Sequence, residues 1–253
     1  MLSTDKLVIV CAGKDTLKAS SYCFQLLQLC IGVGKGMSLR RLYLPAKTSN
    51  DILGLSDIGI SEGNISICVD SIVYEVRKYG FKAVFADFEH LESEVVSEFL
   101  SKLDDRLNKE KIKFFVPICN EFSVKYAVLV TQSALSGGNL EEYISSLLEK
   151  YPNRIAVSIR PICTDFALPS KDSEGTPISD EERMERIKKY DSGVFFSSDL
   201  CAKYFTYMDE NENGHFVIFD DDSTISAKIQ RLNALDIDKI FALYPHVQNL
   251  LAN

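Results

Sequence analysis

Short apolar runs alternate with amphipathic stretches along most of the chain. The apolar runs predict buried strands at residues 7–13, 40–46, 81–89, 113–119, 125–132, 154–163 and 239–244. A run that is apolar on both faces is typical of a parallel strand covered by helices. The alternation of such strands with helical patterns predicts an α/β fold with a parallel sheet and right-handed crossovers.

The stretches between these runs have helical spacing of apolar residues. Helices are expected at 17–33, 64–79, 92–108, 140–150, 181–189 and 222–235. Asn64 or Ser66 can cap the second of these helices, and Gly80 ends it. This pattern predicts a (β/α)8 (TIM) barrel, whose eighth strand must come from the ambiguous stretch 47–63 because only seven strands are evident.

One region departs from the alternation. Residues 202–220 contain two apolar segments around ENENG, which predicts a small β-hairpin inserted before the last strand. The glycine-rich GVGKGM lacks phosphate-loop spacing and follows a predicted helix, so it is predicted to be a plain turn. No linker divides the chain, which is expected to form a single barrel domain over 1–253.

The composition narrows the possible partners. The chain has 253 residues, a net charge of -8 and a pI near 5.0. A general electrostatic attraction to nucleic acid is therefore not expected. No apolar run is long enough to span a membrane, and the N-terminus lacks the features of a secretory signal. We expect a cytoplasmic protein, or an exported one if a signal has been removed; the oligomeric state is left open.

The seven cysteines and three histidines give no sign of a metal or cofactor site. The cysteines are scattered through mostly apolar runs, and none forms a CxxC pair. This pattern favours reduced, buried thiols over a disulfide framework. The three consecutive aspartates Asp220, Asp221 and Asp222 resemble a calcium cluster. Because acids just before a helix more often cap it, we expect them to have a capping role.

The run FKAVFADFE carries the clearest candidate chemistry. In an extended strand Phe85, Asp87 and Glu89 share one face, so two acids lie at the C-terminal tip of an apolar strand. In a (β/α)8 barrel the chemistry takes place at that end of the strands. The alternative is a solvated acidic pair at the start of a loop.

The segment VDSIVYEVRKYGFKAVFADFEHLESEVVSEFLSKLDDRL resembles the central block of glycoside hydrolase family 18, the chitinase-like barrels, whose strand ends in DxxDxDxE. RIAVSIRPICTDFALP, YFTYMDENENGHFVIFDDDSTISAK and DKIFALY resemble later blocks of the family in the same order. The similarity is greatest to short bacterial members associated with spore coat and cortex peptidoglycan, which lack the large inserted domain of many chitinases. It covers roughly residues 65–244.

This resemblance implies a substrate and a mechanism. Glu89 matches the catalytic acid and Asp87 the neighbouring aspartate, which would orient the N-acetyl group of a chitin-type or peptidoglycan glycan. In the family the N-acetyl carbonyl of the substrate attacks the anomeric carbon, so no enzyme carboxylate is the nucleophile. A second carboxylate close to the acid helps to keep it protonated near neutral pH.

Several positions depart from the family pattern. Phe85 stands where an inner aspartate belongs, and Lys82 replaces the outermost one. The family's tyrosine and acid on the sixth strand are replaced by Gln132 and Ser133, so the carbonyl support is missing unless the Gln132 amide supplies it. The chain has no tryptophan. The resemblance places Asp165 at the rim of the site, and a sugar ring would have to stack on an aromatic residue from the set Tyr244, Phe166, Tyr207 and Phe122.

Three hypotheses follow. The first is a glycosidase that acts on N-acetylglucosamine glycans, with Glu89 and Asp87 as catalytic residues and with Gln132, Asp165, Tyr244 and Phe85 lining the substrate site. The second is a catalytically degenerate barrel that binds a glycan or a protein. The third is an unrelated α/β enzyme that holds an anion near Arg160.

Overall fold

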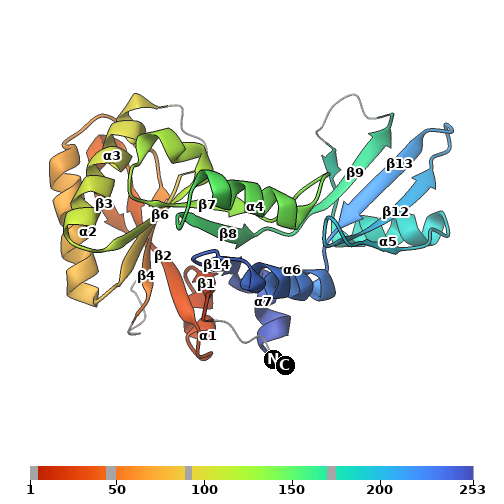
Figure 1. Cartoon of the computed structure of the whole chain (residues 1–253), viewed down its shortest axis with the longest axis horizontal. Helices are drawn as coiled ribbons and strands as arrows, with labels where there is room; N and C mark the ends of the chain where they lie inside the picture. Colours follow the sequence, from red (N-terminus) through yellow and green to blue (C-terminus); the bar gives the residue numbers. More distant parts are fainter. Residues whose placement is uncertain (1–4, 44–49, 89–92, 170–174, 253) are drawn as a thin grey trace.

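A closed barrel of eight parallel strands forms most of the molecule (Figure 1). The computed structural model describes residues 5–43, 50–88, 93–169 and 175–252. Strand β14 pairs with β1, which pairs in turn with β2, so the sheet closes on itself and the predicted (β/α)8 barrel is confirmed. In order around the barrel the strands are β1 (Leu7–Cys11), β2 (Gln25–Val33), β4 (Ile52–Asp57), β5 (Ala83–Asp87), β6 (Lys113–Pro117), β7 (Val128–Gln132), β8 (Ile155–Ile159) and β14 (Ile240–Leu243).

Amphipathic helices cover the outside of the barrel, as their apolar spacing predicts. The side chain of Asn64 accepts a hydrogen bond from the Ile67 N–H, and Gly80 ends the same helix with a φ of 77°, a conformation that glycine adopts without strain. The helices packed against the barrel are α2 (Ile65–Tyr79), α3 (Glu94–Lys109), α4 (Leu140–Lys150) and α6 (Asp222–Ala234), with the shorter α1 (Asp15–Ala19) and α7 (Tyr244–Leu251) near the chain ends.

The helix predicted over 17–33 is wrong. Only α1 is helical there, and β2 occupies Gln25–Val33 in the barrel wall. The strand is buried on both faces, so its apolar residues follow no two-residue alternation and some fall at helical spacing by coincidence. Gln28 interrupts the run but is itself buried, where its amide donates to the Asp51 carboxylate at 2.6 Å.

The missing eighth strand is β4, which lies inside the ambiguous stretch 47–63 as predicted. The prediction of a barrel strand at 40–46 is wrong. Only β3 (Leu39–Arg41) forms there, and it pairs antiparallel with β2 instead of joining the ring of parallel strands. The remainder of that range from 44 lies outside the described residues. Of GVGKGM, Gly32 and Val33 end β2 and Lys35–Met37 form a short 3-10 turn, η1, so the turn is present as predicted but follows a strand and not a helix.

Aromatic rings fill the interior of the barrel. The ring of Phe241 meets the rings of Phe85 and Phe115 edge to face, each with ring centroids 5.2 Å apart. Small and β-branched residues fill the remaining space, so the interior is a packed core and not a pore. All seven cysteines are unpaired thiols, and four of them are buried.

A second sheet is inserted between β8 and α6 and stands beside the barrel in Figure 1. Two neighbouring strands of this sheet, β12 (Ala202–Met208) and β13 (Gly214–Phe219), form the predicted hairpin, but the inserted unit is larger than a hairpin. The five strands run in the order β10 (Thr176–Pro177), β9 (Cys163–Leu168), β13, β12 and β11 (Phe195–Ser197). Helix α5 (Asp180–Lys189) covers one face, with Ile187 packed against a core of Ile178, Phe205, Val217 and Phe219.

A buried ion pair joins the inserted sheet to the barrel. Lys228 on α6 donates to Asp220 at 2.7 Å, and both side chains are at most 1% exposed. The same carboxylate accepts hydrogen bonds from the Ile162 N–H at 3.0 Å and from the Thr224 hydroxyl at 2.8 Å. These bonds tie the strand that leaves the barrel to the strand that returns to it.

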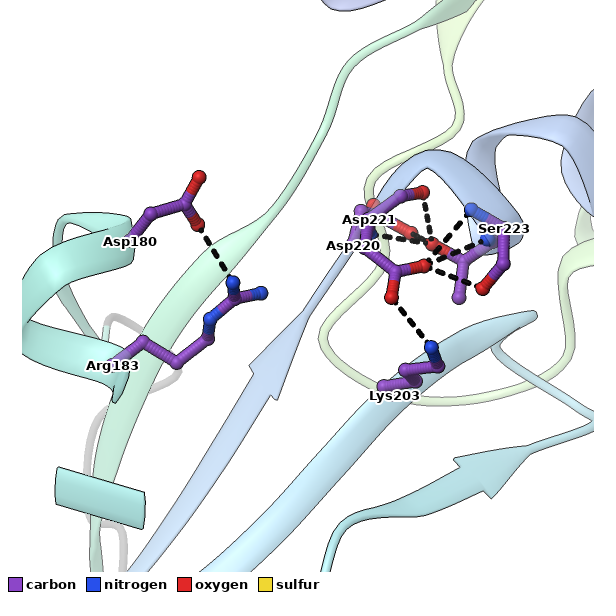
Figure 2. Close-up of polar contacts among 7 residues, drawn as sticks. Asp180, Arg183, Lys203, Asp220, Asp221 and Ser223 are labelled. Carbon is purple, nitrogen blue, oxygen red and sulfur yellow. Dashed lines mark hydrogen bonds and ion pairs between the residues drawn. The ribbon is translucent and has the colours of Figure 1, made fainter. Parts of the chain in front are cut away.

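The next aspartate, Asp221, caps α6, so one of the three consecutive aspartates has the predicted capping role. Figure 2 shows Lys203 of β12 and Ser223 directed at the Asp221 carboxylate. Burial raises the pKa of Asp221, but the hydrogen bonds from Lys203, Ser223 and the Thr224 N–H outweigh it and lower this pKa to about 2. The carboxylate therefore stabilises the fold in its ionised form.

The Asp221→Asn variant tests this contribution through its pH dependence. The pKa of Asp221 is lower in the folded state than its usual value of 3.8, so its stabilisation is complete above about pH 4 and is lost as the pH falls towards 2. Because the side chain is one-third exposed, we expect about 1 kcal/mol. The melting temperature of Asp221→Asn, which retains a capping side chain, should fall below that of the parent at pH 6, and this gap should be clearly smaller at pH 2.5 because part of the stabilisation has by then been lost. An equal gap at both values would contradict the assignment.

Candidate active site

Two adjoining cavities open at the C-terminal ends of the barrel strands. The first, about 460 Å³, extends over β6 and β7, and the second, about 270 Å³, extends over β1, β2 and β14. Both are lined by Phe85, Asp87, Gln132, Ser158 and Arg160. Strand tips at the C-terminal end of a (β/α)8 barrel are where catalytic groups collect, so this double cavity is the candidate site.

Strand β5 carries Phe85 and Asp87 to the cavity floor and wall. The two residues share one face of the strand, as the alternation predicts, and that face points to the barrel interior. Phe85 is only 8% exposed and packs on Phe241, so an aromatic ring fills the place where the resemblance expects an inner carboxylate. Asp87 lies one layer higher, half-buried at the mouth.

Strand β7 supplies the next predicted residue. Gln132 lies at its end, exposed to both cavities, and so stands on the same hollow as Asp87. Ser133, which replaces an acid of the family pattern, is fully buried, and its hydroxyl accepts a hydrogen bond from the Arg160 N–H at 3.1 Å. Ser133 therefore positions the backbone of the β8 tip, while Gln132 faces the cavity.

Three further lining residues come from late in the chain. Arg160 directly follows β8, Leu243 ends β14, and His246 lies in the first turn of α7. Burial and the nearby Arg160 guanidinium lower the pKa of His246, so its imidazole is neutral at neutral pH. Its Nδ1 has no hydrogen-bond partner among the described residues. The position of His246 just after a predicted barrel strand was the available sequence signal, which our sequence analysis did not use.

Asp165 and Tyr244 are not brought to this cavity. Asp165 lies on β9 of the inserted sheet, where it accepts a hydrogen bond from the Tyr207 hydroxyl at 2.6 Å and meets His215 Nδ1 at 2.8 Å. Tyr244 is buried between the barrel and its outer helices, with its ring 6.5 Å from that of Tyr22. Leu243, the last residue of β14, lines the cavity, whereas Tyr244 begins α7 and packs on the outside of the barrel.

Glu89 lies outside the described residues, which end at Phe88 before this gap. The segment that leads to it is held from one side. Asn120, buried in the 3-10 turn η2 (Ile118–Ser123), donates its side-chain amide to the Phe88 carbonyl at 2.9 Å. The last peptide group before Glu89 is thereby anchored to the loop that follows β6.

Other features of the described residues carry no competing site. A groove of about 610 Å³ between β3 and α2 is larger than either cavity, but it lies outside the barrel wall and the ion pair Arg41–Glu75 crosses it. No cluster of three or more acidic, histidine or cysteine side chains suited to a metal ion occurs within the described ranges. Among the described helices, none is long and apolar enough to cross a membrane.

The chain is similar to bacterial spore enzymes and to chitinases. No protein-family model matches it. A curated relative, the cortical fragment-lytic enzyme of Bacillus subtilis (strain 168), is 22% identical in an alignment of 205 residues that covers 67% of this chain and 47% of the relative. The chain thus spans about half the length of that protein.

Solved structures share the architecture over almost the whole chain. The spore cortex-lytic enzyme SleL of Bacillus cereus is similar with a TM-score of 0.58 and 17% identity, over 98% of this chain and 73% of that one. A mutant GH18 chitinase from Cycas revoluta, in complex with (GlcNAc)4, is similar with a TM-score of 0.59 and 12% identity, over 97% of both chains. The chain therefore has the fold of the glycoside hydrolase family 18 chitinases.

Proposed function

We propose that the double cavity binds an N-acetylglucosamine-containing glycan of the chitin or peptidoglycan type and hydrolyses it with Glu89 as general acid/base. One observation carries the proposal. Asp87 and Gln132, predicted from the sequence as neighbours of the reacting sugar, line the same hollow at the strand tips. The cavity also offers Arg160 and a neutral His246, which can bind the hydroxyl and amide groups of a sugar.

The chemistry requires few protein groups. The carboxyl group of Glu89 would protonate the glycosidic oxygen, while the N-acetyl carbonyl of the substrate attacks the anomeric carbon. Asp87 would orient the N-acetyl group, and the Gln132 side-chain amide would donate a hydrogen bond to its carbonyl. Water then opens the cyclic intermediate, and the carboxylate of Glu89 takes up the proton of that water molecule.

A second candidate function is glycan binding without hydrolysis. The packing of Phe85 against Phe241 favours it, because an aromatic ring there removes one of the polar groups that would stabilise charge in the transition state. The cavity then acts as a recognition site, and the carboxylate of Asp87 serves only as a hydrogen-bond acceptor.

One pair of measurements, of binding and of hydrolysis, distinguishes the two candidate functions. We expect the protein to bind the N-acetylglucosamine hexamer in calorimetry and to release reducing ends from it or from purified peptidoglycan. Binding without release would support the second candidate against the first. The absence of both binding and release on both substrates would reject the two candidates together.

A further inference from the structure

A row of aromatic side chains crosses the face of the inserted sheet that α5 does not cover. One face of this sheet is covered by α5, but the opposite face carries one ring on each of four neighbouring strands. We call this set the aromatic strip: Phe166 on β9, Phe216 on β13, Tyr204 on β12 and Phe195 on β11. The strand register places them on one side, because Phe166 pairs with Phe216 and Phe195 pairs with Tyr204.

The strip is continuous and accessible. The Tyr204 ring lies 5.7 Å from that of Phe195 and 5.4 Å from that of Phe216, each tilted by 32°. Phe195 is 58% exposed, and the other three rings are half-buried. Apolar side chains that lie side by side at a protein surface often mark a binding site.

The strip leads to the candidate active site. Leu135, which follows β7, lines the first cavity. Like Phe166 and Phe216 of the strip, it also packs against the buried apolar cluster of Leu200, Ala202 and Ile218. A ligand that leaves the cavity past Leu135 therefore meets the strip next. On the strands, no residue of this face carries a charge. Its other members are small, hydroxyl-bearing or apolar, namely Thr164, Leu168, Pro177, Ser197, Thr206, Met208, Gly214 and the buried Ala202 and Ile218.

We propose that the aromatic strip binds the sugar rings of a glycan chain that extends out of the cavity. The proposal rests on the proposed function of the cavity. A flat row of rings without charge suits an uncharged pyranose, whose apolar C–H face packs on an aromatic face while its hydroxyl groups remain in water. An acidic or basic peptide would find no partner for its charges on this face.

Calorimetry with two lengths of oligosaccharide tests the strip. We expect the N-acetylglucosamine hexamer to bind the parent protein roughly tenfold more tightly than the dimer. Phe195→Thr and Tyr204→Thr, which keep a residue with high strand propensity, should each remove most of that difference and leave the dimer affinity unchanged. Met184→Thr is the matched control, since Met184 is also 58% exposed but lies on α5. Far-UV circular dichroism verifies that each variant is folded.

The outcomes distinguish the strip from the cavity. If the dimer binds and neither Thr variant weakens the hexamer, the strip proposal is wrong and the proposed function stands. If neither oligosaccharide binds the parent protein, the proposed function fails and the strip fails with it. If Phe195→Thr instead converts a dimeric protein into a monomer in sedimentation without a change in hexamer affinity, the strip is an interface between two copies and the glycan proposal is overturned.

Discussion

Glu89→Gln is expected to lower the rate of glycan hydrolysis by about 10²–10⁴-fold, the usual contribution of a general acid. Glutamine has nearly the same shape as glutamate but has no carboxyl proton to give to the leaving oxygen. The affinity for the N-acetylglucosamine hexamer should stay within about twofold of the parent value, because the cavity wall at Asp87, Gln132 and Arg160 is unchanged. Reducing-end release and calorimetry on the same samples measure the two quantities.

Glu94→Gln is the matched control for this experiment. Glu94 is an exposed acid in the first turn of α3, five residues further along the chain, and its replacement removes the same charge. We expect its hydrolysis rate to equal that of the parent. Equal rates in Glu89→Gln and the parent would eliminate Glu89 as the acid, and an equal loss in both variants would assign the effect to net charge.

Lys228→Met is expected to destabilise the protein by about 3–5 kcal/mol, the cost of leaving one partner of a buried ion pair uncompensated. Methionine fits the space of the lysine stem, but the Asp220 carboxylate, whose side chain is fully buried, loses its only cation among the described residues. Because Asp220 also accepts a hydrogen bond from the Ile162 N–H, the substitution loosens the junction between the barrel and the inserted sheet. Urea unfolding followed by far-UV circular dichroism measures the change, since the chain has no tryptophan.

Lys203→Met provides the comparison at the same junction. Lys203 pairs with Asp221, but about a third of each side chain is exposed, so water screens the interaction. We expect a loss of at most about 1 kcal/mol. A difference of less than 1 kcal/mol between the two variants would show that burial does not set the strength of the Asp220–Lys228 pair.

Local patterns predicted the elements whose burial differs between their two sides. The helices α2, α3 and α4 have one apolar face each, and this asymmetry produces a periodicity that the sequence displays. Strand β2 lacks such an asymmetry because the barrel interior and the outer helices cover both of its faces, so the spacing of its apolar residues falsely predicts a helix. The five-stranded sheet was predicted only as a hairpin for two reasons. β10 and β11 have two and three residues, too few to show a period, and β9 begins at Cys163, where the predicted strand 154–163 ends.

By itself the sequence determined the barrel class, most of its strands and helices, and an acidic position, Asp87, on the inward face at the tip of β5. Only the tertiary structure decided which distant residues join it: Gln132 and Arg160 do, whereas Asp165 lies in the inserted sheet and Tyr244 behind the barrel wall. The physical reason is that spacing along a strand fixes only the side to which a residue points. Closure of the barrel and the path of the inserted chain bring residues far apart in sequence to one hollow, and no local pattern records either.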